Sequence, residues 1–302
     1  MILSAVDAQT LVDAVGLGAV YALMAVGIGL VFGMLRLVNF AYGQLIMAGA
    51  YTLAFTSGWP VAGSVLACFA VVIALSFLME GAVFRPLRTQ SPAVMLVTTF
   101  AVAFLLQAVA LILDIRDGTI GEPAVSVASL NQVVTIGGVD VRKVTILAVV
   151  VAIVALALLA LLLGKTTIGL QMRAAAADFR TARLLGVKAD RVIGAAVLLS
   201  GILAATVAVI LTVQFPLVSP DFALKETIVV LVGVVVGGID RLWTATLGGF
   251  AIGFATGVIN GALPTDKTVF LPSAVFALVI LVLLLRPAGL FAGGRATAVD
   301  RV

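Results

Sequence analysis

Between two long apolar runs stands the polar stretch Thr166-Thr-Ile-Gly-Leu-Gln-Met-Arg-Ala-Ala-Ala-Ala-Asp-Phe-Arg-Thr-Ala-Arg-Leu-Leu-Gly-Val187. Counted from 165 to 191, this insert carries six cations and two anions, so its charge of +4 equals the net charge of the whole chain. A helix-prone, arginine-bearing segment inside an apolar sequence indicates a docking element at a membrane surface. Its charged residues are Lys165, Arg173, Asp178, Arg180, Arg183, Lys188, Asp190 and Arg191.

The composition of the chain is that of an integral membrane protein. Hydrophobic residues make up 63% of its 302 residues and charged residues 11%, and the mean hydropathy is +1.29. This leaves too little polar surface to cover a water-soluble globule. A helix needs about 20 apolar residues to cross a bilayer. Six runs are long enough, at 14–35, 60–79, 93–113, 144–163, 192–213 and 268–285.

Three weaker runs set the number of crossings. Runs 38–57 and 243–262 are rich in glycine and small residues, and 227–239 has only 13 residues. If all nine runs span, the amino terminus lies outside and the carboxyl terminus in the cytoplasm. If 36–57 and 227–241 are instead re-entrant, the chain has seven crossings and both termini keep their places. We therefore expect an all-α polytopic bundle of about seven to nine spans.

The distribution of charge agrees with this orientation. It places thirteen of the eighteen basic residues inside, and nine of the fourteen acids, Glu226 among them, outside, as the positive-inside rule requires of the cations. Residues 114–143 then form an outer loop and 165–191 a cytoplasmic loop, in one transmembrane domain over 1–302. Two β-prone runs around Gly137-Gly138 predict a small hairpin in the outer loop.

Two glycine-punctuated segments occupy comparable positions in the two halves of the chain. They are Asn39-Phe-Ala-Tyr-Gly-Gln44 and Gly237-Gly-Ile-Asp-Arg241. Interrupted helices in matching positions mark transporter pathways, because freed backbone groups are tolerated only where a cavity satisfies them. Glycines that merely allow tight helix packing are the equal alternative. The polar candidates for the pathway are Asn39, Tyr42, Gln44 and Asp240, although Asn39 could instead cap a helix and Tyr42 could be a packing aromatic.

The residue types argue against an enzyme. The chain has no histidine, one cysteine and no carboxylate cluster at metal-ligand spacing, so we expect neither a metal site nor a catalytic residue. No Gly-x-x-x-x-Gly-Lys-Ser/Thr phosphate loop is present either. The middles of the long runs lack ionisable groups, which disfavours an ion-coupled carrier. Energy for transport would therefore come from a partner.

The cytoplasmic insert has the pattern of an amphipathic helix. Met172, Ala175, Ala176, Phe179 and Ala182 recur at steps of three and four residues, while two arginines seven residues apart share another face. The alternative is that these charges only fix the topology. A second helix is expected to begin near residue 190.

At these residues the sequence resembles the permease subunits of ATP-driven branched-chain amino acid importers, of the smaller, LivH type. The likeness runs over nearly the whole chain, and the ordered set of motifs carries it. The motifs are Gly33-Met-Leu-Arg-Leu-Val-Asn-Phe-Ala-Tyr-Gly-Gln44, Glu80 with Arg85-Pro-Leu-Arg88, Thr98-Thr99, Thr167-x-Gly-x-x-Met-Arg-Ala174, Ala182-Arg-Leu-Leu-Gly186, Gly237-Gly238, Gly248-Gly249 and Arg286-Pro-Ala-Gly-Leu-Phe291.

This resemblance implies that 173–187 contains the coupling helix, which fits a groove on an ATPase subunit. Arg173, Asp178, Arg183 and Gly186 match that motif. Gly186 is expected to end the helix, because glycine tolerates the left-handed turn. Tyr42 and Gln44 depart from the histidine and acid common in the family, and Asp240-Arg241 from a usual Gly-Ser. These departures leave the substrate open.

The resemblance also implies the partners. They are a second homologous permease, two cytoplasmic ATPases that bind ATP and magnesium, an external substrate-binding protein and membrane lipid, with no nucleic acid. The expected function is a bacterial inner-membrane permease subunit for branched-chain amino acids, working by alternating access. Permeases for urea or short amides are the alternative within the class, and a partner-independent channel or ion-coupled carrier is a distant one.

Overall fold

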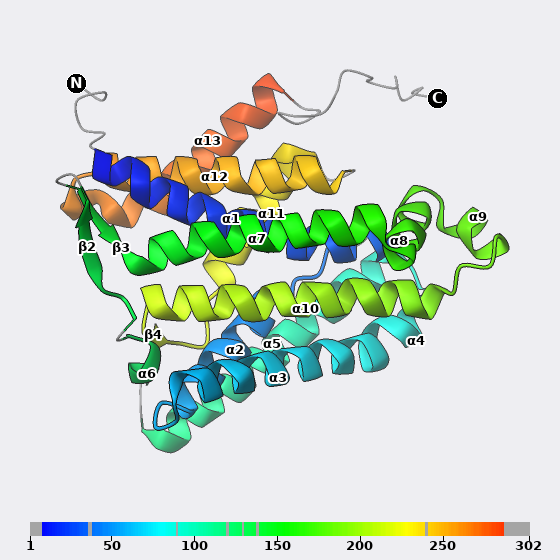
Figure 1. The fold of residues 1–302 in the computed structure, drawn as a ribbon, viewed down its shortest axis with the longest axis horizontal. Helices are drawn as coiled ribbons and strands as arrows, with labels where there is room; N and C mark the ends of the chain where they lie inside the picture. The colour runs from blue at the N-terminus through cyan, green and yellow to red at the C-terminus, as the bar shows by residue number, and fades with distance from the viewer. Residues whose placement is uncertain are drawn as a thin grey trace.

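A computed structural model describes residues 8–35, 38–88, 90–118, 121–128, 130–136, 139–238 and 241–286 of the chain. Most of the long helices lie side by side with roughly parallel axes (Figure 1). Seven helices in the described part are long and apolar enough to cross a membrane. They are α1 (Ala8–Leu35), α3 (Val61–Met79) with its extension, α5 (Pro92–Asp117), α7 (Lys143–Lys165), α10 (Ala189–Gln214), α12 (Leu242–Ala262) and α13 (Leu271–Leu285), which follows the 3-10 helix η2 (Thr265–Phe270).

The two ends of the bundle differ in their short elements. One end, here the hairpin end, holds a two-stranded hairpin, and the other, the loop end, holds two short helices of the polar insert (Figure 1). At the hairpin end are β1 (Glu122–Pro123), α6 (Val125–Ala128), β2 (Val133–Ile136), β3 (Val139–Arg142) and β4 (Leu217–Val218). At the loop end are the π-helical turn η1 (Glu80–Phe84), α4 (Arg85–Leu87), α8 (Thr167–Ala177) and α9 (Phe179–Leu184).

Two shorter helices complete the passages through the bundle. They are α2 (Tyr42–Phe55) and α11 (Leu224–Gly237), each of 14 residues. At about 1.5 Å per residue, each is about 21 Å long and too short to span the hydrocarbon layer alone. Because α1 ends at the loop end and α3 begins at the hairpin end, α2 lies on a passage between the two ends. The described part thus holds seven helices of spanning length, the last formed by η2 and α13 together, and two half-helices.

The two half-helices meet inside the bundle by their amino-terminal ends. Tyr42, at the start of α2, lies against the middle of α1, where a Cβ on Gly27 would fall 2.1 Å from the tyrosine hydroxyl. Gly43 lies equally close to the first turn of α11, since its Cβ would fall 2.4 Å from Oγ1 of Thr227. Each of the two crossings that contain α2 and α11 is therefore interrupted at the place where α1, α2 and α11 meet.

A run of glycines allows the backbones of α1 and α12 to touch. Gly249, Gly253, Gly257 and Gly261 recur every four residues on α12, and a Cβ on each would fall 2.3 to 2.8 Å from an atom of α1. We call these four residues the glycine seam. A different face of α12 packs on α11 through Gly248, whose Cβ would fall 2.5 Å from Cα of Gly237. For Gly237, the packing alternative of the sequence analysis is therefore the one that the structure supports.

The hairpin end confirms one loop prediction and adds an element. The strands β2 and β3 pair antiparallel from Val133 opposite Arg142 to Ile136 opposite Val139, as the β-prone runs predicted, while the turn at 137–138 lies outside the described residues. The two-residue strands β1 and β4 also pair, which the sequence did not indicate. Nearby, the hydroxyl of Tyr51 donates to the buried carboxylate of Asp114 at 2.9 Å.

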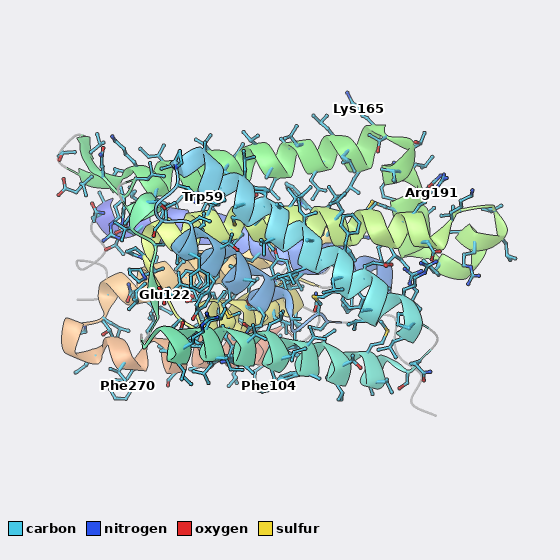
Figure 2. All side chains as sticks on the ribbon, turned by 90° about the horizontal axis from the view of Figure 1, so that it is seen from below. Trp59, Phe104, Glu122, Lys165, Arg191 and Phe270 are labelled. Atoms are coloured by element: carbon cyan, nitrogen blue, oxygen red, sulfur yellow. The ribbon has the colours of Figure 1, made fainter. Side chains whose placement is uncertain are left out.

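Burial separates the central helices from the outer ones. The hydrophobic residues of α1 and α10 are mostly buried, whereas α3, α5, α7 and α13 expose many large apolar side chains. Trp59 and Phe270 project at the hairpin end, and Phe104 projects from α5 (Figure 2). An apolar exterior with aromatic residues toward an end is what a lipid-facing surface requires.

Candidate functional site

The polar insert folds into two short helices that follow α7 at the loop end. Thr166 turns the chain, because its Oγ1 accepts from the backbone nitrogen of Gly169 at 3.0 Å and so caps the start of α8. Met172 and Ala175 on α8 and Ala182 on α9 are buried, as the apolar periodicity predicted. The first helix of the insert, α8, is therefore packed onto the bundle, and α9 packs on α8 beyond the end of the bundle (Figure 1).

The expectation of one continuous helix through the coupling motif is wrong. The chain leaves helical geometry at Asp178, whose φ is −149° and ψ is 102°, so α8 ends at 177 and α9 begins at 179. The carboxylate of Asp178 accepts from the backbone nitrogen of Thr181 at 3.1 Å and from its hydroxyl. Asp178 thus acts as an N-cap for α9, a role for which aspartate is favoured over a place within a helix.

Gly186 adopts the predicted left-handed turn. Its φ is +90°, its backbone nitrogen donates to the carbonyl of Arg183, and the nitrogen of Val187 donates to the carbonyl of Ala182. These two bonds form a Schellman motif, in which glycine closes the carboxyl end of a helix. Gly186 therefore ends α9 and redirects the chain toward α10.

Two exposed leucines stand beside the predicted coupling residues. Arg173, Asp178 and Arg183 are exposed, and Leu184 and Leu185 are exposed over 83% and 80% of their surface. We call Arg183 to Gly186 the loop tip. Large apolar side chains this exposed at a polar, charged surface indicate contact with another protein. Sequence reasoning missed them, although they break the apolar spacing of the helix.

The insert is also connected to the central helices. The side chain of Arg173 lines a small cavity of about 100 Å³ together with Gly33 of α1, Leu163 of α7 and Leu242 of α12. Because α8 also contacts α1, α7 and α10, a displacement of α8 would act directly on the loop ends of these three helices.

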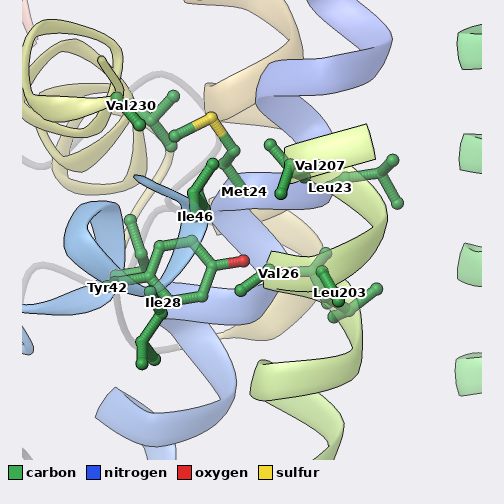
Figure 3. Close-up of a cluster of buried hydrophobic side chains, with 14 of the residues drawn as sticks. Leu23, Met24, Val26, Ile28, Tyr42, Ile46, Leu203, Val207 and Val230 are labelled. Carbon is green, nitrogen blue, oxygen red and sulfur yellow. The ribbon is translucent and has the colours of Figure 1, made fainter. Parts of the chain in front are cut away.

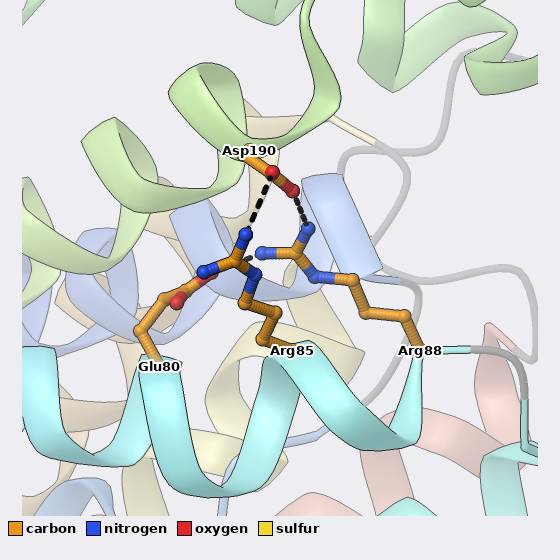
Figure 4. A network of polar contacts seen from close by, with 4 residues as sticks. All are labelled: Glu80, Arg85, Arg88 and Asp190. Carbon is orange, nitrogen blue, oxygen red and sulfur yellow. Dashed lines mark hydrogen bonds and ion pairs between the residues drawn. The ribbon is translucent and has the colours of Figure 1, made fainter.

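A group of four charged side chains ties α3 to the start of α10 at this same end (Figure 4). Arg88, on the residue after α4, pairs with Glu80 of η1 and with Asp190 of α10. Arg85 adds a longer contact of 3.4 Å to Asp190. Asp190 thus connects the end of the polar insert to the arginines on the extension of α3.

Replacing Arg88 with glutamine is expected to destabilise the protein by about 3 kcal/mol, because it leaves the largely buried carboxylate of Glu80 without its cation. Arg85→Gln is the matched control and should change the melting temperature little, since its side chain is 65% exposed. Thermal unfolding in detergent measures both. Equal melting temperatures for the two variants would contradict the prediction.

The candidate pathway residues near the start of α2 are buried. The side-chain oxygen of Asn39 accepts from the backbone nitrogen of Ala41 at 3.1 Å, so this amide supports the turn into α2. The hydroxyl of Tyr42 and Oε1 of Gln44 are buried without a hydrogen-bond partner in the described part. Figure 3 shows Tyr42 among Met24, Ile28 and other apolar side chains. Asp240 lies outside the described residues.

Glu226 belongs to this region, although its charge placed it in an outer loop. It lies in the first turn of α11, next to Thr227, which packs on Gly43 of α2. Its Oε2 is buried with no hydrogen-bond partner among the described residues. The short apolar run 227–239 allowed a re-entrant segment, but it gave no sign that Glu226 lies inside the bundle.

Together these features describe a bundle for transport. In the described part, interrupted helices with buried, unpaired polar atoms lie at its centre, and a charged surface with two exposed leucines lies at one end. Such interruptions in a membrane bundle are characteristic of substrate pathways.

Comparison with known proteins agrees with this geometry. Residues 10–286 match the family described as branched-chain amino acid transport system / permease component. The chain is 30% identical to the high-affinity branched-chain amino acid transport system permease protein BraD of Pseudomonas aeruginosa, over 93% of this chain and 94% of the relative. It is 28% identical, with the same coverage, to LivH of Escherichia coli K12 and of Salmonella typhimurium. No solved structure gives a significant match. The chain belongs to the permease component family of branched-chain amino acid transport systems.

Proposed function

We propose that this chain is the membrane permease subunit of an ATP-driven importer of branched-chain amino acids. The observation that carries the proposal is the match of residues 10–286 to the permease family on a bundle whose two half-helices meet at its centre. As one permease domain over 1–302, it would work with a second homologous permease and an external binding protein. It would lie in the bacterial cytoplasmic membrane with its amino terminus outside and its carboxyl terminus inside.

ATP and magnesium belong to the two ATPase subunits, since the sequence holds no phosphate loop. The loop tip, with Arg173 and Asp178, is the surface on which one ATPase docks. Closure of the ATPases on ATP pulls this surface and the helices connected to it, and hydrolysis resets them. The exposure of Leu184 and Leu185 supports a partner at this surface.

Substrate passage requires opening near the start of α2. Tyr42 and Gln44, each at most 1% exposed, are closed off in the described arrangement, so the half-helices or their neighbours must move for a molecule to pass. The contacts available there are mostly apolar, which suits weak binding of an aliphatic side chain. Asn39 and Asp240 are proposed to contribute to the same pathway.

Deletion of this chain from its source cells is expected to abolish most of the ATP-dependent uptake of labelled leucine, and re-expression should restore it. Excess unlabelled isoleucine or valine should compete, whereas urea and acetamide should not. Uptake by a strain that lacks other leucine importers gives the clearest result. Unchanged leucine uptake in that strain, with loss of urea or amide uptake, would contradict the proposed substrate and favour the urea or short-amide alternative.

A further inference from the structure

A polar cavity of about 310 Å³ opens at the hairpin end, away from both the loop tip and the half-helices. Four helices contribute to it. Its polar lining consists of Asp13, Arg142, Thr145, Gln214 and Asn260, and Leu17 and Phe215 add apolar surface. This volume is at the small end of the range for sites that hold small molecules.

The two charged residues of the cavity, Asp13 and Arg142, have opposite signs but are not paired with each other. No ion pair joins Asp13 to Arg142 in the described part, where the guanidinium of Arg142 has no hydrogen-bond partner. The carboxylate of Asp13 accepts from the amide of Gln9 at 3.1 Å.

The helix ends reinforce this polarity. Arg142 is the residue before the first turn of α7, where the backbone carries partial positive charge. Gln214 is the last residue of α10, and Asn260 lies in the last turn of α12, where the backbone carries partial negative charge. One wall of the cavity therefore favours an anionic group, and the wall with Asp13 favours a cationic group.

Tight packing closes the cavity toward the membrane interior. A Cβ on Gly16 would fall 2.6 Å from the side-chain methyl of Thr145, and one on Gly257 would fall 2.5 Å from Cα of Ala14. The helices α1, α7 and α12 thus leave no gap at these positions. A molecule in the cavity would be held at the hairpin end until these helices moved.

From this arrangement we propose that the cavity is a receiving site for a zwitterionic α-amino acid, which rests on the proposed function. The carboxylate of the ligand binds Arg142, its ammonium group binds Asp13, and an aliphatic side chain contacts Leu17 and Phe215. The amides of Gln214 and Asn260 complete the polar contacts. A neutral molecule such as urea lacks both charges, so this site selects amino acids.

The test measures direct binding of labelled leucine to the purified permease with its ATPases and no binding protein. Arg142→Gln and Asp13→Asn should each weaken leucine binding by about tenfold or more, because each removes one charge-assisted contact. Arg116→Gln and Asp140→Asn are the matched controls, since both charges are exposed at the same end and neither lines the cavity. The controls should bind leucine as the unaltered permease does.

Two analogues of leucine test which charged group of the ligand each residue binds. Leucinamide lacks the carboxylate, so Arg142→Gln should not weaken its binding, and 4-methylpentanoate lacks the ammonium group, so Asp13→Asn should not weaken its binding. If the unaltered permease takes up leucine but shows no direct binding, or if both variants bind like their controls, the cavity is not a receiving site although the proposed function stands. Equal losses for leucine and both analogues would overturn the charge assignment and indicate a structural or docking role. Absence of leucine uptake by the complete, unaltered transporter would instead overturn the proposed function.

Discussion

Replacing both Leu184 and Leu185 with aspartate is expected to abolish ATP-driven uptake without unfolding the permease. In the free chain both side chains are exposed, at 83% and 80%, so the change costs the isolated bundle little. In the complex each leucine would lose about 1.5 to 3 kcal/mol of burial energy. Two such losses weaken ATPase binding by roughly a hundredfold or more, before the added charge is counted.

The measurement is the amount of ATPase that copurifies with the permease, together with leucine uptake. Val269→Asp is the matched control, because Val269 is 82% exposed but lies at the hairpin end. Arg173→Gln and Arg183→Gln should give smaller losses, since exposed charges contribute little to affinity by themselves. Full ATPase retention in the double leucine variant would show that the loop tip is not the docking surface.

Replacing Gly257 with leucine is expected to prevent assembly of the bundle. The new Cβ would fall 2.5 Å from Cα of Ala14, a backbone atom that no change of rotamer can move away. Separating α1 from α12 to make room would expose the contact along the whole glycine seam. The cost should therefore exceed about 3 kcal/mol, the upper part of the usual range for overpacking.

Gly164→Leu is the control for this substitution. It also places leucine at a helical glycine, but no atom lies within 4 Å of the new Cβ, so normal amounts of folded protein are expected. The measurement is the yield of monodisperse permease after extraction in mild detergent. Equal yields of the two variants would mean that the backbones of α1 and α12 are not in the close contact described.

The membrane helices could be predicted from the sequence because their signal is local. The apolar run 60–79 corresponds to α3 at 61–79, and the run 192–213 lies within α10. The half-helices could not be placed in the same way. Where α2 starts depends on Gly27 making room for Tyr42, and two residues distant in the sequence leave no periodic signal. The pairing of β1 with β4 depends on the same kind of distant contact.

The structure of the polar insert was predictable in part for the same reason. Gly186 and the buried face of Met172 and Ala182 follow from turn chemistry and helical spacing, and both are confirmed. The break at Asp178 was missed because an aspartate after a run of alanines can either continue the helix or cap a new one. Here its carboxylate accepts from the backbone nitrogen and the hydroxyl of Thr181, so it caps α9. The exposure of Leu184 and Leu185 depends on the turn that follows them.

The glycine seam restricts how this permease can change shape. Its four contacts fix the backbone of α12 to that of α1 along most of their length, so these two helices must travel as one rigid body. A Cβ at any of these four positions would meet an atom of α1. Any rearrangement that opens the bundle is therefore confined to interfaces cushioned by side chains, such as the apolar gap between α7 and α10. The pair α1 and α12 would then be the fixed frame against which the other helices are displaced.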